Sequence, residues 1–133
     1  MARIDELTNI DVREATRLRK AGVRTSEALL RRSTSRTGRD QLANACSVDA
    51  DAILAWASRA DLLRVKGVGG EYAALLEAAG VATIRDLRRR NPKALTARLS
   101  EVNDHTRLVR RLPTEGMVAE WVDGAKVIEP VVR

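Results

Sequence analysis

Apolar residues recur along this chain with the three-to-four-residue spacing of amphipathic helices. In residues 71–79, one helical face carries the apolar side chains Tyr72, Leu75, Leu76 and Ala79. No segment alternates apolar and polar residues for long enough to predict a strand. We therefore expect an all-α fold, a small helical bundle without a sheet.

Turn and capping residues predict where several of these helices begin and end. Gly80 fits the left-handed position that follows a helix, and Thr83 is a suitable N-cap for the next one. Asn91-Pro92 ends that helix and opens another, expected to cover residues 93 to about 100. Pro113-Thr114 opens a last helix.

The chain contains an internal repeat. Residues 10–30 (IDVREATRLRKAGVRTSEALL) match residues 68–88 (VGGEYAALLEAAGVATIRDLR) at apolar and turn positions, whereas the charged positions differ. Two segments that share a backbone and a buried face, but not a surface, give this pattern. Trp56 and Trp121 also stand at matching places, so we expect both to be core residues rather than stacking platforms.

The repeat sets the domain organisation that we expect. Residues 1–133 would form a single compact helical domain made of two repeats, 1–61 and 62–127. Residues 128–133 would be a frayed tail.

Residues 62–76 (LLRVKGVGGEYAALL) carry the most specific signal. Its defining positions are apolar, small or glycine: Leu62, Val65, Gly67, Val68, Gly69, Ala73 and Leu76. We expect Leu62 and Val65 to complete a helix on its buried side. We expect Gly67 and Gly69 to adopt positive φ in a tight turn that leaves backbone N–H groups uncovered. Val68 would insert between the two helices, and Ala73 would lie where they cross.

This spacing resembles the helix-hairpin-helix pattern, hxxhxGhGxxxAxxh, at every defining position. The resemblance implies that the hairpin lies along a nucleic-acid backbone, where N–H groups at a helix start hold a phosphate without reading sequence. Residues 78–87 resemble hairpin modules of recombinase N-terminal domains and of the C-terminal domain of the polymerase α chain. The resemblance implies tandem helix-hairpin-helix units in a SAM-like or recombinase-N-terminal-like bundle.

The order of the whole chain also resembles a bacterial family catalogued as domain of unknown function 4332. Four stretches carry this likeness: the "aGV.T..LL" turn, "TGRDQLA", "ADLLRVKGVG" and the late "P…V..WV..AK" helix. Because that family has no assigned activity, the likeness implies a fold and no chemistry.

The first copy departs from the hairpin pattern. It has Asn9-Ile10-Asp11 where the second copy has Gly67-Val68-Gly69. Asp11 is a good N-cap, and its carboxylate would satisfy the donors that a phosphate needs. We therefore interpret the first hairpin as degenerate and structural.

The net charge of +6 permits a polyanionic partner without requiring one. Arginines form three clusters: Arg31-Arg32-Arg36-Arg39, Arg88-Arg89-Arg90 and Arg107-Arg110-Arg111. They would extend a basic track if they converge on the second hairpin, and would otherwise be solvated helix ends. Glu71, in the first turn after the glycines, opposes a phosphate there.

The sequence contains no motif for a metal site or a catalytic site. The single His105 and the single Cys46 do not make a metal site, and no phosphate-binding loop or nucleophile elbow occurs. We expect neither an enzyme nor a cofactor. Without a long apolar run or a signal peptide, and with one cysteine, the chain is expected to be soluble and cytoplasmic.

We therefore expect a non-catalytic module that binds nucleic acid, with DNA favoured, through backbone contacts. The residues expected to take part are Arg64, Lys66, Gly67, Val68, Gly69, Gly70, Arg88, Arg89 and Arg90. The alternative, favoured by Glu71 and by the acidic first copy, is an adaptor that uses the same fold to bind a protein. No membrane or small-molecule partner is expected.

Overall fold

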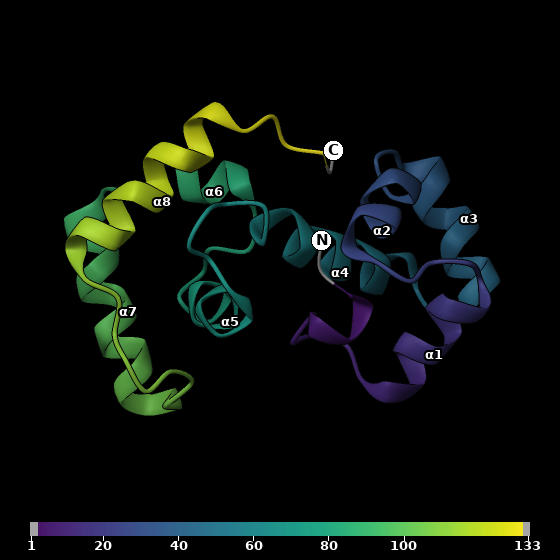
Figure 1. Cartoon of the computed structure of the whole chain (residues 1–133), viewed down its shortest axis with the longest axis horizontal. Helices are drawn as coiled ribbons and strands as arrows, with labels where there is room; N and C mark the ends of the chain where they lie inside the picture. Colours follow the sequence, from purple (N-terminus) through teal and green to yellow (C-terminus); the bar gives the residue numbers. More distant parts are fainter. Residues whose placement is uncertain (1–2, 132–133) are drawn as a thin grey trace. The chain divides into compact units, whose positions relative to one another are not determined.

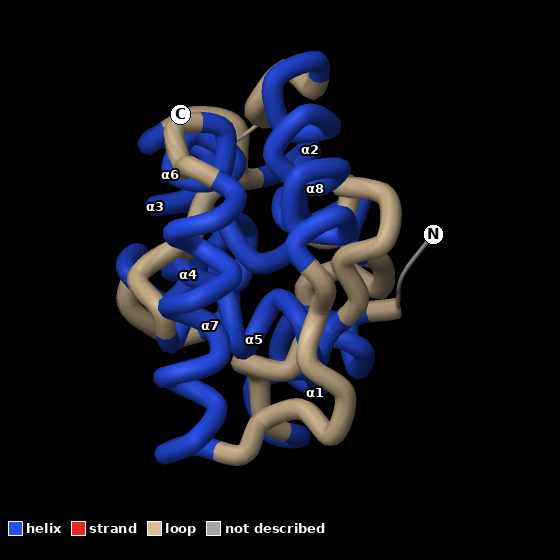
Figure 2. The backbone as a smooth tube through the Cα atoms, turned by 90° about the vertical axis from the view of Figure 1, so that its left-hand side faces the viewer, coloured by secondary structure: helices blue, strands red, loops and turns tan. Residues whose placement is uncertain are grey.

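The computed structural model describes residues 3–131, which form helices joined by turns (Figure 1). In chain order these are η1 (Ile4–Glu6), α1 (Val12–Lys20), α2 (Ser26–Arg32), α3 (Arg36–Cys46), α4 (Ala50–Leu62), α5 (Gly70–Ala78), α6 (Ile84–Arg88), α7 (Pro92–Thr106) and α8 (Glu115–Val127). Figure 2 shows no strand in this part of the chain, where Arg3 and Thr25 make an isolated β-bridge. The all-α prediction is confirmed for these residues.

The chain divides into two compact units. The first comprises the described residues up to Asp61 together with Pro130 and Val131, and the second comprises residues 62–129. In the first unit Pro130 is buried, and the Val131 N–H donates to Asp61 Oδ2 at 3.1 Å. These two contacts involve the part of the expected tail that the structure describes, and residues 132–133 of that tail lie outside the described residues.

Equivalent helices of the two units have matching starts and turns. Helices α1 and α5 each contain nine residues, from Val12 and from Gly70. The glycines that follow them, Gly22 and Gly80, have φ values of 89° and 94°. The sequence repeat is thus matched in the backbone at these positions.

Side-chain caps explain where most helices start. Six caps each accept a hydrogen bond from the backbone N–H three residues later: Asp11, Thr25, Ser35, Thr83, Asn91 and Thr114. Each such bond satisfies one donor that a helix start leaves unpaired. The predicted capping roles of Asp11 and Thr83 are confirmed. Helix α7 runs past residue 100 to Thr106 because neither glycine nor proline follows Ser100 to stop it.

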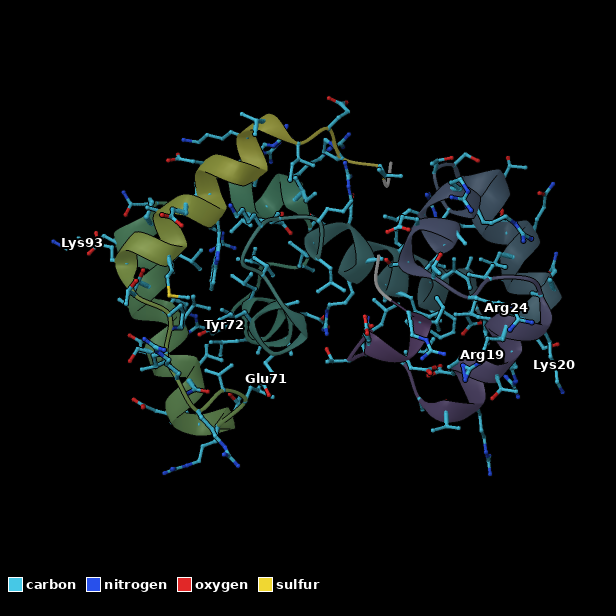
Figure 3. All side chains as sticks on the ribbon, in the orientation of Figure 1. Arg19, Lys20, Arg24, Glu71, Tyr72 and Lys93 are labelled. Carbon is cyan, nitrogen blue, oxygen red and sulfur yellow. The ribbon has the colours of Figure 1, made fainter. Side chains whose placement is uncertain are left out.

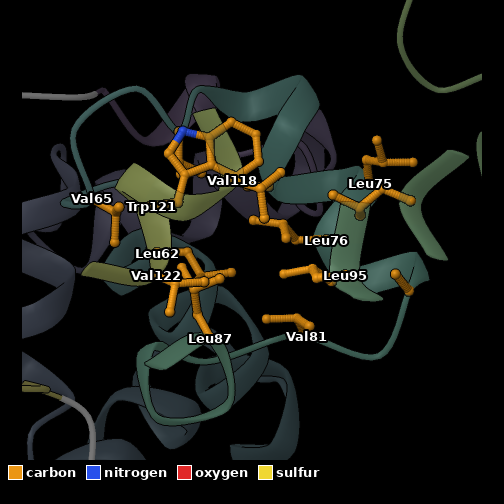
Figure 4. Close-up of a cluster of buried hydrophobic side chains, with 14 of the residues drawn as sticks. Leu62, Val65, Leu75, Leu76, Val81, Leu87, Leu95, Val118, Trp121 and Val122 are labelled. Atoms are coloured by element: carbon orange, nitrogen blue, oxygen red, sulfur yellow. The ribbon is translucent and has the colours of Figure 1, made fainter. Parts of the chain in front are cut away.

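The second unit has an aliphatic core built around one tryptophan. Figure 4 shows Trp121 and Val118 of α8 beside Leu76 of α5. Every residue of this cluster belongs to the second unit. Trp56, in the first unit, is also buried, so both tryptophans are core residues as predicted.

Candidate nucleic-acid interface

Residues 63–69, which we call the glycine turn, connect α4 to α5. Helix α4 ends at the buried Leu62, as predicted. Val65 lies beyond the end of that helix, so the prediction that it also completes the helix is wrong. The chain leaves the helix in two tight turns, in which the Val65 N–H donates to Leu62 O and the Val68 N–H donates to Val65 O, each at 3.0 Å. Val65 and Val68 enter the core of the second unit, and these tight turns expose the residues between them.

The two glycines of the turn have different backbone conformations. Gly67 has φ +89°, and a Cβ added to it would lie 3.0 Å from Trp121 Nε1. Gly69 has φ −91° and ψ −178°, which is extended backbone that any residue adopts. Positive φ is therefore confirmed at Gly67 and wrong at Gly69. The reason is that Gly69 is the N-cap of α5, and N-cap residues occupy the extended region.

Gly69 leaves the start of α5 without a side-chain cap. A Cβ added there would meet nothing within 4 Å, so neither space nor strain demands glycine. What glycine supplies at this position is the absence of a side chain. The first turn of α5 is therefore open on this side.

The equivalent start in the first unit is closed. Asp11 has φ −91° and ψ 175°, nearly the conformation of Gly69. Its Oδ1 accepts from the Glu14 N–H at 2.8 Å, and Glu14 Oε1 accepts from the Asp11 N–H at 3.0 Å. The N-cap of α5, Gly69, makes no such side-chain bond.

A groove of about 430 Å³ lies at the open start of α5. Its lining comes from the glycine turn and the first turn of α5, and from the loop between α7 and α8: Gly67, Gly69, Gly70, Glu71, Tyr72, Arg110 and Arg111. We call residues 107–114 the arginine loop. Figure 3 shows Tyr72 on the side of α5 that faces α7 and α8.

The arginine loop is held by side chains of the helices beside it. Asn103 Nδ2 donates to Val109 O, and the Val109 N–H donates to Asn103 Oδ1, each at 3.0 Å. Tyr72 Oη donates to Arg111 O at 3.1 Å. The Tyr72 ring packs on Trp121 with centroids 5.1 Å apart and planes tilted by 49°.

A family model described as Domain of unknown function (DUF4332) matches residues 8–128. This chain belongs to the DUF4332 family. The matched range contains both the glycine turn and the arginine loop. No curated protein and no solved structure matches the chain.

The predicted site residues around the turn of this DUF4332 chain lie at different places. Gly67, Gly69 and Gly70 line the groove, whereas Val68 is buried behind it. Lys66 is exposed in the turn. Arg64 is exposed, and its Nη1 donates to Glu129 O at 3.1 Å.

The three consecutive arginines at the end of α6 point to different environments. Half-buried Arg88 donates from Nε to Ala125 O at 3.2 Å and from Nη2 to Ile128 O at 2.6 Å, so it satisfies carbonyls at the end of α8. Arg90 Nη2 donates to Gly80 O at 3.3 Å, and Arg89 is exposed. None of the three belongs to the residues that line the groove.

The arginines that line the groove are instead Arg110 and Arg111. The sequence identifies them only as part of an arginine cluster that would extend a basic track. No short motif signals their position, because it depends on contacts between α5, α7 and the arginine loop. The lining thus contains two cationic residues, Arg110 and Arg111, and one anionic residue, Glu71. The residues that line the groove therefore have a net positive charge.

The remaining reactive side chains of this family member lie elsewhere. Cys46 is buried in the first unit, and this burial raises the pKa of its thiol, against the opposing effect of Arg32 and Arg17. His105 lies on α7 beside a separate cavity of about 390 Å³. Within residues 3–131, no helix is long and apolar enough to cross a membrane.

Proposed function

We propose that this chain is a non-catalytic module that binds a nucleic-acid backbone at the glycine turn, without sequence preference, in the cytoplasm. The observation that carries the proposal is the uncapped start of α5 at Gly69, which opens into the groove. A helix start offers N–H donors and the positive end of the helix dipole, which together suit a phosphate. Phosphate contacts of this kind carry no sequence information.

We also propose that the glycine turn belongs to a helix-hairpin-helix and that residues 4–11 are its degenerate copy. Two equivalent hydrogen bonds support this interpretation. The Leu7 N–H donates to Ile4 O at 3.1 Å, as the Val65 N–H donates to Leu62 O at 3.0 Å. The copies then differ at their N-caps, because one bears a carboxylate and the other bears no side chain.

Titration of labelled duplex and single-stranded DNA with the full chain, over a series of salt concentrations, tests this proposal. We expect log K to fall linearly with log salt concentration, by about 0.9 per contacted phosphate for duplex and about 0.7 for single strands. We expect oligonucleotides of different base composition to bind alike. Absence of binding at low salt would refute the proposal.

A second candidate function is a protein-binding adaptor. Glu71 lies in the groove, and Leu108 and Leu112 of the arginine loop are each 40% exposed. Exposed leucines beside charged groups suit a protein surface better than a bare phosphate chain. An affinity pull-down that recovers one stoichiometric protein after nuclease treatment would favour this candidate. Recovery that depends entirely on nucleic acid would count against it.

A further inference from the structure

We infer that the arginine loop provides a second phosphate contact, which Tyr72 and Asn103 position beside the glycine turn. The ligand is then a chain of linked phosphates, a nucleic-acid strand, rather than a single phosphate. This inference rests on the proposed function, and it adds the groove's second half, its positioning residues and the class of its ligand.

The arginine loop has a fixed backbone although it contains no helix. Val109 and Pro113 are buried, and the Asn103 amide bonds both the N–H and the carbonyl of Val109. Thr114 then caps α8 by accepting from the Met117 N–H at 3.1 Å. These anchors hold the loop between them, so its exposed residues are presented from an ordered backbone.

Tyr72 connects this loop to the glycine turn. Its hydroxyl bonds the carbonyl of Arg111, and its ring packs on Trp121. Trp121 in turn lies against Gly67, where a Cβ would approach Nε1 to 3.0 Å. A continuous series of contacts therefore sets the position of Arg111 relative to the turn.

The guanidinium groups of Arg110 and Arg111 are available to a ligand. Both residues are exposed, and within the described part of the chain no ion pair or side-chain hydrogen bond engages either group. Both line the same groove as Gly69. A guanidinium presents several donors in a fixed plane, which matches phosphate oxygens.

The two halves of the groove suit different phosphates of one strand. The start of α5 offers backbone donors, and the arginine loop offers charged side chains across the groove. A single phosphate held at one half leaves the other half unused. Linked phosphates engage both halves at once, so the second contact forms at a high effective concentration.

The test uses fluorescence anisotropy of the full chain with labelled single-stranded and duplex DNA over a salt series. We expect the double variant R110Q/R111Q to bind more weakly and to show a smaller salt slope, by about 0.7 to 0.9 for each phosphate that it no longer binds. The charge-matched control R85Q/R98Q, which changes exposed arginines outside the groove lining, should keep a steeper slope than R110Q/R111Q. Equal slopes for the two double variants would overturn the inference.

A double-mutant cycle tests the positioning role of Tyr72. Tyr72→Phe removes the hydroxyl that bonds Arg111 O but keeps the ring on Trp121. We expect it to weaken binding about twofold to tenfold in the parent chain, and to have little further effect in R110Q/R111Q. An equal effect in both backgrounds would overturn the positioning role, since a purely structural tyrosine acts in both.

Competition experiments test the class of ligand. We expect an unlabelled oligonucleotide to displace the probe at far lower phosphate concentration than inorganic phosphate or a mononucleotide does. Equal competition by either small anion would overturn the requirement for linked phosphates. Inorganic polyphosphate that outcompetes the oligonucleotide would overturn nucleic acid as the source of those phosphates.

The two proposals fail in different ways. If Gly69→Asp weakens binding while R110Q/R111Q does not, the inference is overturned and the proposed function stands. If the parent chain binds none of the DNA probes at low salt, both are overturned.

Discussion

Two glycines of the glycine turn differ in what they contribute, although they stand two positions apart. Gly67 is required by its backbone, because its φ of +89° lies in the region that side chains rarely adopt. Trp121 adds a second constraint by filling the space that a Cβ would need. Gly69 has neither constraint, so substitutions there change chemistry with little change in the backbone.

This difference predicts opposite effects on stability. We expect Gly67→Ala to lower the free energy of unfolding by about 1–2 kcal/mol or more, since it adds left-handed strain and a contact with Trp121. We expect Gly69→Asp to leave it unchanged or raise it by a few tenths of a kcal/mol, because aspartate is a good N-cap. Urea denaturation followed by circular dichroism measures both. A Gly67→Ala variant as stable as the parent would contradict this account of the turn.

The sequence predicts which residues form the turn, but not the conformation of each glycine. A glycine pattern is compatible with positive φ at either position, because glycine adopts both signs of φ readily. Gly69 takes extended backbone because α5 begins at Gly70, and helix boundaries are the least certain part of sequence-based prediction. The role of Asp11 is easier to predict, because its side chain can cap the helix that follows it.

At the scale of whole elements, the end of α8 depends on a residue from α6. Arg88 donates to the carbonyls of Ala125 and Ile128, which α8 leaves without partners in its own helix. The guanidinium is half-buried, so its bonds are partly shielded from water. Arg88 is thereby a packing residue of the second unit, whereas its neighbour Arg89 extends from the surface.

We expect Arg88→Gln to lower the free energy of unfolding by about 1–3 kcal/mol, because it removes charge-assisted hydrogen bonds to two carbonyls. The matched substitution Arg89→Gln should change it by less than about 0.5 kcal/mol, as usual for an exposed site. Thermal or urea unfolding of the two variants gives the comparison. Equal stability of the two variants would show that the bonds to α8 contribute little.

Helix starts are easier to predict from the sequence than helix ends or the contacts that long side chains make. Thr83 and Asn91-Pro92 specify starts through local chemistry, and both start a helix as expected. The end of α7 has no such signal before Arg107, which adopts a left-handed φ of 51°. Of the three consecutive arginines, Arg88 is the last residue of α6, whereas Arg89 and Arg90 follow the helix. Their common charge therefore does not reveal their separate roles.

At the scale of the whole molecule, each unit has its own buried residues. Leu18 in the first unit and Leu76 in the second occupy equivalent positions of the repeat, and both are fully buried. Their neighbours also match, because the Val23 N–H donates to Leu18 O at 2.9 Å and the Val81 N–H donates to Leu76 O at 2.8 Å. The repeat therefore provides a pair of matched core substitutions.

We expect Leu18→Ala and Leu76→Ala each to destabilise mainly the unit that contains it, by about 2–5 kcal/mol. Hydrogen exchange measured by mass spectrometry resolves the two units in one experiment. Leu76→Ala should reduce protection within residues 62–129, and Leu18→Ala within residues 3–61. Loss of protection over the entire chain in both variants would mean that the units unfold together.

Only part of the groove lining could be predicted from the sequence. The glycine turn is a contiguous motif, so its place in the lining could be anticipated. Arg110 and Arg111 are separated from it by about 40 residues, and they reach it through Tyr72 and Asn103, whose contacts leave no local sequence pattern. For the same reason, nothing in the sequence shows which arginine cluster, Arg88-Arg89-Arg90 or Arg107-Arg110-Arg111, lies nearer the glycine turn.

The most direct test of the central claim compares DNA binding by the parent chain and by Gly69→Asp over a salt series. The variant is well suited to this purpose, because Asp11 already adopts the same backbone conformation with a carboxylate at the equivalent position. Gln41→Glu, which adds one negative charge at an exposed position of the first unit, is the control for net charge. Circular dichroism and melting establish that both variants fold like the parent.

If the open start of α5 holds a phosphate, Gly69→Asp binds more weakly than Gln41→Glu. Its salt slope is also smaller than that of the parent by about 0.9 for duplex DNA, which corresponds to one phosphate fewer held by the protein. A folded Gly69→Asp variant that binds with the affinity and salt slope of Gln41→Glu would contradict the claim, and the glycine turn would then be a packing element of an adaptor.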